Sequence, residues 1–304
     1  MELAKNTYHT PVLLNESVTA LDIIPNGTYV DVTFGGGGHS REILRRLGEN
    51  GRLVAFDRDS DAEANKISDP RFIFIRNNFR FLHNLLKYNG IGQVNGILAD
   101  LGVSSHQFDE GERGFSFRFN AQADMRMNQD ADFSARKLLQ SYPQEELTRI
   151  FKSYGELNGA SRLAAAIVSK RQTSPIETTG DLIETLSPLL PKKDINSQLA
   201  KLFQALRIEV NKEMLALEQL LVHSLSVLKP GGRLVVITYH SLEDRLVKNF
   251  MRSGSIDGKQ EKDFYGNVQT PFELCTKKAI APSAEEVERN GRARSAKLRV
   301  AQKK

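Results

Sequence analysis

The fold is decided by Tyr29-Val-Asp31-Val-Thr-Phe34-Gly35-Gly36-Gly37-Gly38-His39-Ser40. β-Branched and aromatic residues at 29–33 predict a strand, and the pattern at 41–47 predicts a helix. Four glycines lie between them, where the backbone must turn sharply and let a ligand approach without a Cβ in the way. A strand, a tight turn and a helix N-terminus form the arrangement that holds an adenine-containing cofactor in doubly wound α/β folds.

A second predicted strand supports this interpretation of the glycine run. Residues 52–57 are mostly apolar and end in Asp57, and we expect a helix to follow Asp59 and to stop near Asp69 and Pro70. An acid in this place typically accepts hydrogen bonds from ribose hydroxyls. A flexible turn would be the simplest explanation of the glycines alone, but their position between two strands favours a cofactor site.

The spacing of the glycines indicates which cofactor to expect. A dinucleotide fingerprint requires G-x-G-x-x-G, and here Gly35 and Gly37 fill the first two places while Ser40 falls on the third. Shifting the pattern by one residue puts Arg41 there instead. A nicotinamide cofactor is therefore disfavoured. A compact nucleoside cofactor without a pyrophosphate, such as S-adenosylmethionine (AdoMet), fits better.

Composition sets the broad class of the protein. The chain has 304 residues, and Lys plus Arg exceed Asp plus Glu by 42 − 37 = 5, which suggests an anionic partner. The N-terminus lacks an apolar signal core, and no apolar run approaches the length of a membrane span. Cys275 is the single cysteine, so we expect no disulfide framework and no metal site. We expect a cytoplasmic location and no membrane partner.

The remaining strand signals predict a seven-stranded, Rossmann-like sheet of the class I AdoMet-dependent methyltransferase type. Residues 71–75 are apolar enough for a strand buried on both faces, and residues 93–100 form a fourth strand that ends in Asp100. Residues 233–238 form a fifth. Runs around 272–277 and 297–301 are expected to form the hairpin that completes the sheet.

The alternation of strands and helices stops between Ser104 and Leu206. Helical patterns occupy residues 134–140, 143–154, 162–170 and 181–189. We therefore predict a methyltransferase core at 1–106 and 207–304, with an inserted helical substrate-recognition subdomain at 107–206. One long amphipathic helix through residues 199–221 returns the chain to the sheet.

Side chains at the strand tips are the candidate catalytic and cofactor residues. Phe79 follows the third strand and either covers an adenine ring or packs in the core. Asp100 is either an acceptor for an attacking amine or an AdoMet ligand. Tyr239 and His240 follow the fifth strand, where they either stack on and hydrogen-bond a target base or serve the structure. Methylation of cytosine C5 would require a cysteine nucleophile, and Cys275 lies away from every inferred tip, so an exocyclic amine is favoured.

Two regions are candidates for contact with nucleic acid. An aromatic and basic loop contains Arg113, Phe115 and Phe117. The two phenylalanine rings are candidates for stacking on the target base, and Arg113 is a candidate contact for the RNA. The other region is the basic C-terminal part of the chain. Its cations are Lys277, Lys278, Arg289, Arg292, Arg294, Lys297, Arg299, Lys303 and Lys304. A solvated surface would explain them, but beside a nucleoside site we favour contact of Arg292 and Arg294 with RNA phosphates.

The chain also resembles a known family, the bacterial small-subunit ribosomal RNA methyltransferase H or MraW family. The matching segments are HTPVLL (9–14), DVTFGGGGHS (31–40), AFDRD (55–59), DLGVSS (100–105), RGFSF (113–117), DMRM (124–127), QALRIEV (204–210), YHSLEDR (239–245) and RARSAKLR (292–299). They span almost the whole chain, in order, and as a set they are highly specific. Gly36 is a departure, because family members often carry a side chain there.

The resemblance implies AdoMet-dependent methylation of the exocyclic N4 of a cytidine in the decoding region of small-subunit rRNA. It also implies a set of residues that line the AdoMet site. These are Gly37, Gly38, His39, Asp57, Phe79, Asp100 and Gln107. The sequence leaves open whether naked rRNA or the assembled subunit is the substrate, and it does not indicate an oligomeric state.

Two other functions are compatible with parts of this sequence. A non-catalytic RNA-binding or assembly factor could use the same fold, since fold alone does not fix function. An intact turn at Gly37 and Gly38 with Asp57 and Asp100 argues against it. A nicotinamide-dependent dehydrogenase is disfavoured by the missing third glycine and leaves the basic C-terminal region unexplained.

Overall fold

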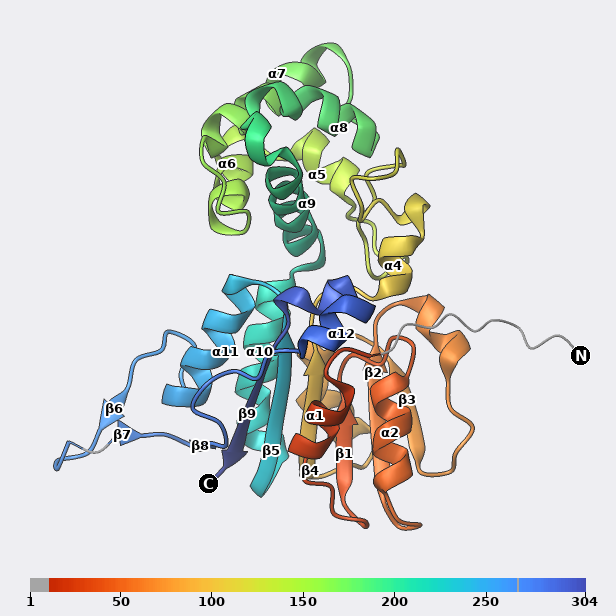
Figure 1. The fold of residues 1–304 in the computed structure, drawn as a ribbon, viewed down its shortest axis with the longest axis vertical. Helices are drawn as coiled ribbons and strands as arrows, with labels where there is room; N and C mark the ends of the chain where they lie inside the picture. Colours follow the sequence, from red (N-terminus) through yellow and green to blue (C-terminus); the bar gives the residue numbers. More distant parts are fainter. Residues whose placement is uncertain (1–10, 267) are drawn as a thin grey trace, which may run out of the picture. The chain divides into compact units, whose positions relative to one another are not determined.

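The computed structural model describes residues 11–266 and 268–304 (Figure 1). The chain divides into two compact units, which are described separately. The first joins Met1–Gly102 to Met214–Lys304, and the second is Val103–Glu213. We call them the sheet unit and the helical unit. No helix in the described part of the chain has the length and apolar character needed to cross a membrane.

The sheet unit is built on seven strands in the order β3-β2-β1-β4-β5-β9-β8. Neighbours from β3 to β5 pair in parallel, whereas β9 pairs antiparallel with both β5 and β8. The strands are β1 (Thr28–Asp31), β2 (Arg52–Asp57), β3 (Phe72–Arg76), β4 (Val94–Asp100), β5 (Leu228–Thr238), β8 (Phe272–Leu274) and β9 (Lys297–Lys303). The expected seven-stranded α/β fold is confirmed, including the closing hairpin. The strand order reverses between β1 and β4, and a crevice for ligands lies outside the carboxyl ends of strands at such a point.

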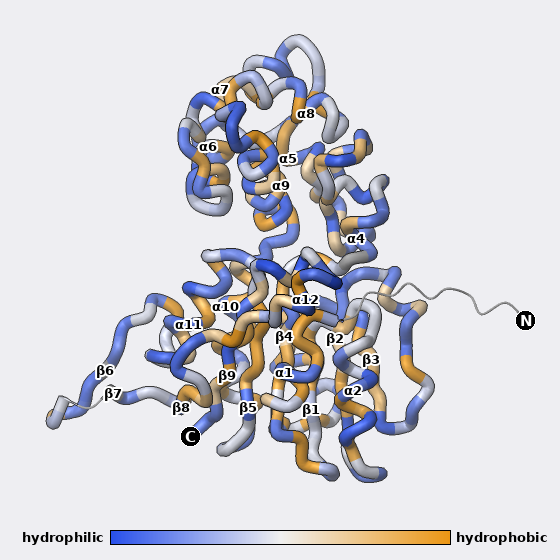
Figure 2. Tube along the Cα trace, viewed as in Figure 1, coloured by the Kyte–Doolittle hydropathy of each residue, from blue (hydrophilic) through white to orange (hydrophobic). Residues whose placement is uncertain are grey.

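Helices cover both faces of this sheet (Figure 1). One face packs on α3 (Leu82–Tyr88), α10 (Glu213–Val227) and α11 (Ser241–Ser253), and the other on α1 (Leu14–Ala20) and α2 (Gly38–Arg46). Apolar residues therefore run along the central strands β1, β4 and β5 (Figure 2). Short elements complete the unit: η1 (Ser60–Asn65), η2 (Phe79–Phe81), β6 (Glu261–Lys262), β7 (Val268–Gln269), α12 (Ala284–Arg289) and η6 (Gly291–Ser295).

Two local expectations for the sheet unit were wrong. Strand β3 is only half-buried, because it forms the edge of the sheet and has a neighbour on one side only. The helix expected after Asp59 is the short 3₁₀ segment η1. The Asp59 side chain accepts a hydrogen bond from the Asp61 N–H and so caps a single tight turn.

The helical unit has a hydrophobic core of its own, drawn from residues between Phe115 and Val210. Its α-helices are α4 (Ser105–Asp109), α5 (Ala135–Ser141), α6 (Gln144–Ser153), α7 (Ala160–Thr173), α8 (Thr179–Leu186) and α9 (Ile195–Asn211). Three 3₁₀ turns join them: η3 (Gly111–Arg113), η4 (Ser187–Leu189) and η5 (Lys192–Asp194). No strand forms within the described backbone of 103–213, where one isolated bridge joins Gln122 to Thr178.

The single long helix expected at 199–221 is instead two helices. Helix α9 ends at Asn211, Lys212 adopts a left-handed conformation with φ 50°, and α10 begins at Glu213. The Asn211 amide donates to Met125 O at 2.7 Å and accepts from the Met127 N–H at 2.8 Å. A buried side chain thus ties the end of α9 to a distant loop.

Candidate functional site at the strand tips

The glycine run forms a turn in which backbone conformation requires glycine at some positions and lack of space requires it at others. Gly35 and Gly37 have φ of 50° and 75°, a region that L side chains rarely adopt. A Cβ on Gly38 would lie 2.1 Å from Cγ of Pro11, so α2 could not begin where it does with any other residue. A Cβ on Gly35 would meet nothing within 4 Å. The backbone at Gly35 is therefore open to a ligand.

Asp31 holds this turn from inside the protein. Its fully buried carboxyl accepts from Ser40 Oγ at 2.7 Å and from the Thr33 N–H at 3.1 Å, which ties the end of β1 to the first turn of α2. Burial raises the pKa of Asp31. Our site prediction missed this residue, although an acid within an apolar strand is itself a signal, because buried carboxyls need dedicated partners.

Asp57 lies at the end of β2, beside the turn, as expected. Its carboxyl accepts from the Gly35 N–H at 2.8 Å and from the Asp59 N–H at 2.9 Å. Burial raises the pKa of Asp57 to about 6. Each carboxylate oxygen can accept more than one hydrogen bond, so both keep capacity for hydroxyl donors.

Asp100, at the tip of β4, is the centre of a second cluster. Its Oδ1 accepts from the Tyr239 hydroxyl at 2.7 Å, and its backbone N–H donates to Thr33 Oγ1 at 2.7 Å. Burial raises the pKa of Asp100 to about 6, against the attraction of His39 and the hydrogen bond from Tyr239, which lower it. Asp100 and Tyr239, which the sequence offers as candidate catalytic residues, thus have their side chains in direct contact.

His39 lies behind Asp100 and is buried. Its Nε2 lies 3.2 Å from Val12 O, which can only accept, so Nε2 carries the proton. Its Nδ1 lies 3.9 Å from Asp100 Oδ2. Burial lowers the pKa of His39, against the attraction of Asp100, which raises it.

His240 serves a different element from Asp100 and Tyr239. It is the N-cap of α11: its Nδ1 accepts from the Glu243 N–H at 3.4 Å, and the Glu243 carboxylate accepts from the backbone N–H groups of Tyr239 and His240. This is a capping box, and the three-residue spacing to Glu243 is its sequence signal. The His240 side chain therefore caps α11 at the strand tip.

Phe79 begins η2 after β3 and is half-buried against the core of the sheet unit. Both interpretations of its ring therefore remain open. In the helical unit, Gln107 is buried and completes the capping box of α4 with Ser104, whose N–H donates to Gln107 Oε1 at 3.1 Å. The segment HTPVLL lies partly outside the described residues, because His9 and Thr10 are not described.

The aromatic and basic loop presents other residues than we expected. Phe115 is buried in the core of the helical unit, and Arg113 donates to the carbonyls of Arg126 and Met127. Phe117 is half-buried, with its ring edge-on to another core phenylalanine. These contacts argue against Phe115 as a platform for a base. Arg118 and Phe119 are the exposed members of the loop, and the Phe119 side chain is 47% exposed.

The basic C-terminal region divides into structural and exposed cations. Arg299 and Lys297 both pair with Asp244, and Lys303 donates to two carbonyls at the end of α10 and the start of β5. Arg292 and Arg294 lie on η6 and are exposed, while Ala293 between them is buried. Lys297, Arg299 and Lys303 make contacts within the protein. Fewer of the nine cations of this region are therefore expected to contact RNA than the sequence alone suggested.

The chain is similar over almost its whole length to proteins of one family. The profile of the MraW methylase family matches residues 6–304. A protein named ribosomal RNA small subunit methyltransferase H from Bacteroides fragilis is 58% identical over 304 residues and covers 100% of both chains. Its namesake from Flavobacterium johnsoniae is 56% identical over 296 residues, 97% of this chain and 98% of that protein. A solved rRNA methylase from Streptococcus thermophilus is 11% identical over 95% of this chain and 94% of that chain, with a TM-score of 0.39, too low to support an argument.

Proposed function

This chain belongs to the MraW methylase family, and from that premise we propose that it methylates the exocyclic N4 of a cytidine in the decoding region of small-subunit rRNA. It is an AdoMet-dependent methyltransferase with the seven-stranded fold of that class. The observation that carries the proposal is the arrangement of the open turn at Gly35, the Asp57 carboxylate and the Asp100–Tyr239 pair at neighbouring strand tips.

The turn suits AdoMet in shape and in hydrogen bonding. The open backbone at Gly35 admits a nucleoside, and the Asp57 carboxylate has acceptor capacity left for two ribose hydroxyls. Gly37, Gly38 and His39 shape the turn behind it, and the family resemblance adds Phe79, Asp100 and Gln107 to the proposed site. AdoMet, when bound, supplies an electrophilic methyl group on a sulfonium.

The protein's part in the reaction is to orient the amine and stabilise the charge that develops on it. An exocyclic amine forms the new N–C bond and must then lose a proton. The Asp100 carboxylate is the proposed acceptor for the amine hydrogen. Its pKa of about 6 leaves it ionised at neutral pH yet more basic than an ordinary aspartate. The Tyr239 hydroxyl fixes the carboxylate by occupying Oδ1.

Cysteine chemistry at C5 of the base finds no support. Cys275 follows β8, which is an edge strand of the sheet three places away from β4, whose tip carries Asp100. Burial raises the pKa of the Cys275 thiol, so it is not an activated thiolate. Attack by an amine needs no protein nucleophile and is the simpler fit to the residues present.

The RNA substrate is proposed from the names of the relatives and from the charge of the protein. Arg292 and Arg294 are the proposed phosphate contacts, and Arg118 and Phe119 are added from the exposed part of the aromatic loop. The target base must be unstacked, because a methyl donor cannot reach an amine inside a helix. The cytoplasmic location remains a prediction.

Methyl transfer from labelled AdoMet tests the proposal. Small ribosomal subunits and naked small-subunit rRNA are the two acceptors, and nucleoside mass spectrometry identifies the product. We expect label as N4-methylcytidine with the wild-type chain and a loss of at least a hundredfold in turnover with Asp100→Asn. AdoMet binding without label on either acceptor would point instead to a non-catalytic RNA-binding factor.

A further inference from the structure

A projecting arm of the sheet unit has no part in the function proposed above. It leaves the end of α11 at Gly254, carries the short antiparallel pair β6 and β7, and returns to the sheet at β8 (Figure 1). Glu261 pairs with Gln269, and Lys262 pairs with Val268. The paired segment is therefore only two residues long on each side.

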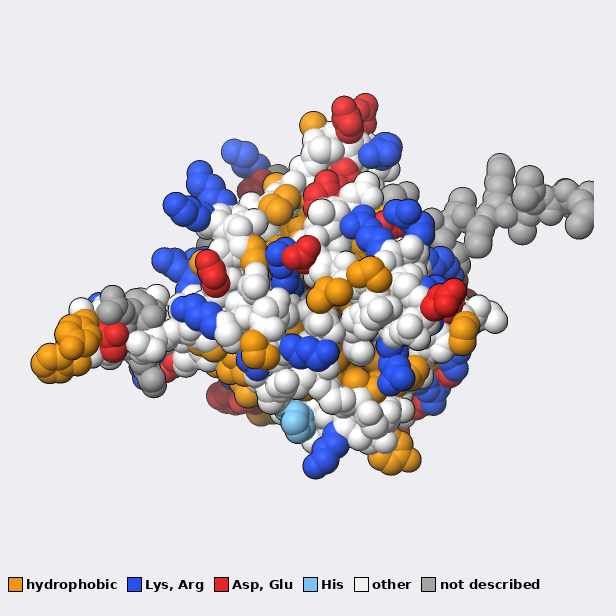
Figure 3. Space-filling view, turned by 90° about the horizontal axis from the view of Figure 1, so that it is seen from below, with side chains coloured by type: hydrophobic (Ala, Val, Ile, Leu, Met, Phe, Trp, Pro, Cys, Tyr) orange, Lys and Arg blue, Asp and Glu red, His pale blue; other side chains and the backbone are white. Residues whose placement is uncertain are grey.

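The tip of the arm is a turn that holds two aromatic side chains in solvent. The Gly266 N–H donates to Asp263 O at 3.0 Å, which places Phe264 and Tyr265 at the two central positions of the turn. Their side chains are 98% and 86% exposed, and their rings meet edge to face with centroids 5.7 Å apart. In Figure 3, hydrophobic side chains gather at the end of the arm.

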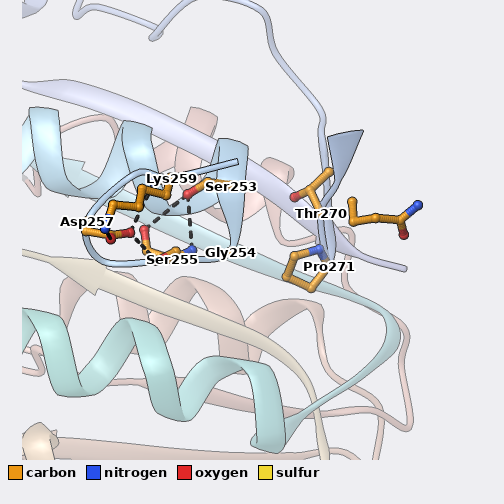
Figure 4. Close-up of a pocket in the computed structure, with 8 residues that line it drawn as sticks. Ser253, Gly254, Ser255, Asp257, Lys259, Thr270 and Pro271 are labelled. Atoms are coloured by element: carbon orange, nitrogen blue, oxygen red, sulfur yellow. Dashed lines mark hydrogen bonds and ion pairs between the residues drawn. The ribbon is translucent and has the colours of Figure 1, made fainter. Parts of the chain in front are cut away.

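The base of the arm is fixed by close packing and a polar network. Gly254 has φ of 75°, and a Cβ there would lie 2.4 Å from Pro271. Ser255 Oγ donates to the Asp257 carboxylate, which also accepts from the Lys259 N–H at 3.1 Å and pairs with Lys259 Nζ at 3.0 Å (Figure 4). A cavity of about 530 Å³ lies among these residues. The tip therefore extends from an anchored base.

From this geometry we propose that Phe264 and Tyr265 form a stacking site for unpaired bases of the RNA substrate, separate from the strand-tip site. The inference rests on the proposed function for its RNA partner. Base–aromatic stacking needs only an open ring face, and it is tolerant of sequence. Lys259 and Lys262 are exposed on the same arm, where cations favour a phosphate backbone.

The size of the tip favours a nucleic acid over a protein partner. Two aromatic side chains offer about 400 Å², roughly half of the 800 Å² that one partner buries in a standard protein–protein interface. The flanking residues Lys262 and Asp263 are charged and do not continue the apolar surface of the rings on that side. A base, in contrast, needs only one open ring face on which to stack.

The test compares RNA binding by full-length variants. The double variant Phe264→Ala/Tyr265→Ala should bind small-subunit rRNA about tenfold more weakly than the wild type, with AdoMet affinity unchanged. Tyr88→Ala is the matched control, because Tyr88 is also an exposed aromatic, at 88%, but lies at the end of α3. Phe264→Leu/Tyr265→Leu keeps an apolar tip without ring faces and should bind as weakly as the alanine variant.

A second measurement is independent of catalysis. Ultraviolet crosslinking of the wild-type protein to rRNA, followed by mass spectrometry, should place crosslinked nucleotides on Phe264 or Tyr265. If the wild type methylates no RNA but these crosslinks form, the proposed function fails while the stacking site stands. Unchanged rRNA affinity in the alanine variant would overturn the stacking site. So would full affinity in the leucine variant, or a loss confined to assembled subunits, which would indicate a ribosomal protein as the partner.

Discussion

Asp57 and Asp100 are the two residues whose protonation should affect how the protein uses AdoMet. Burial raises the pKa of each to about 6, above the value of about 3.9 for an unfolded aspartate. Protonation of each carboxyl is thus more favourable in the folded chain without ligand than in the unfolded chain. These carboxyls therefore stabilise that chain progressively less as the pH rises from about 4 to above 6.

The affinity for AdoMet should increase as the pH rises, whereas the stabilisation from these carboxyls decreases. If Asp57 must be ionised to accept ribose hydroxyls, we expect AdoMet affinity to fall as the pH drops through 6, by up to tenfold for each pH unit below it. Titration calorimetry between pH 5 and pH 8 measures this. Asp57→Asn should bind weakly with a flatter pH dependence, and an equally steep profile in that variant would assign the titration to another group.

Tyr239 should influence the pH at which the methylation rate falls on the acidic side of the pH–rate profile. Its hydroxyl donates to ionised Asp100 and so lowers the pKa of that carboxyl. Removing the hydroxyl in Tyr239→Phe should shift the acidic limb of the pH–rate profile upward by roughly one pH unit. The rate above pH 8 should be affected less. An unshifted limb would mean that Asp100 is not the titrating group and would favour its role as an AdoMet ligand.

Sequence reasoning proposed Asp57 and Asp100 as site residues because each is the acid that ends a predicted strand, and both do lie at strand ends. It missed Asp31 and Thr33, whose roles depend on partners that the fold brings to them. Residue type alone also overestimated Phe115, since an aromatic ring in a polar loop gives no sign of whether it faces solvent or a core.

At the scale of elements, the glycine turn can be tested with a matched pair of substitutions. Gly35 and Gly90 both have positive φ, of 50° and 68°, and a Cβ on either would meet nothing within 4 Å. Alanine at either position should therefore destabilise the fold by about 1 kcal/mol. Only Gly35→Ala should also weaken AdoMet binding, by at least tenfold in calorimetry. Equal AdoMet affinity in the two variants would place the cofactor elsewhere.

Substitutions of His240, the N-cap of α11, distinguish a positioning role for this residue from a catalytic one. His240→Ala should lower the free energy of unfolding by about 1 kcal/mol and reduce turnover, because the cap also orders the tip at Tyr239. Serine is a good N-cap, so His240→Ser should restore both stability and turnover. A stable but inactive serine variant would support the direct catalytic role that the sequence suggested.

The strands were predictable as elements because each is a short apolar run that ends at a turn or a charge. The break between α9 and α10 was not. Hydrophobic spacing continues through it, and the helix end is marked by two hydrogen bonds of the Asn211 side chain, one accepted from Met127 and one donated to Met125, both more than 80 positions away. Periodicity reports which face of a helix is buried and carries no information on such distant contacts.

At the scale of the molecule, two separate cores predict two unfolding transitions. Phe151 is fully buried in the helical unit and Phe250 in the sheet unit. Alanine at either position should remove about 3–5 kcal/mol from its own unit. Differential scanning calorimetry should show Phe151→Ala lowering one transition and Phe250→Ala lowering the other. A single transition lowered by both variants would mean that the units unfold as one.

The position of β9 constrains how the protein is made. This strand lies between β5 and β8 in the sheet, although it follows both of them in the chain. During synthesis β8 emerges from the ribosome with no neighbour to pair with, and the edge of β5 stays open until residues 297–303 have been released. A methyltransferase of ribosomal RNA therefore cannot complete its own sheet while those residues are still inside the ribosome that is making it.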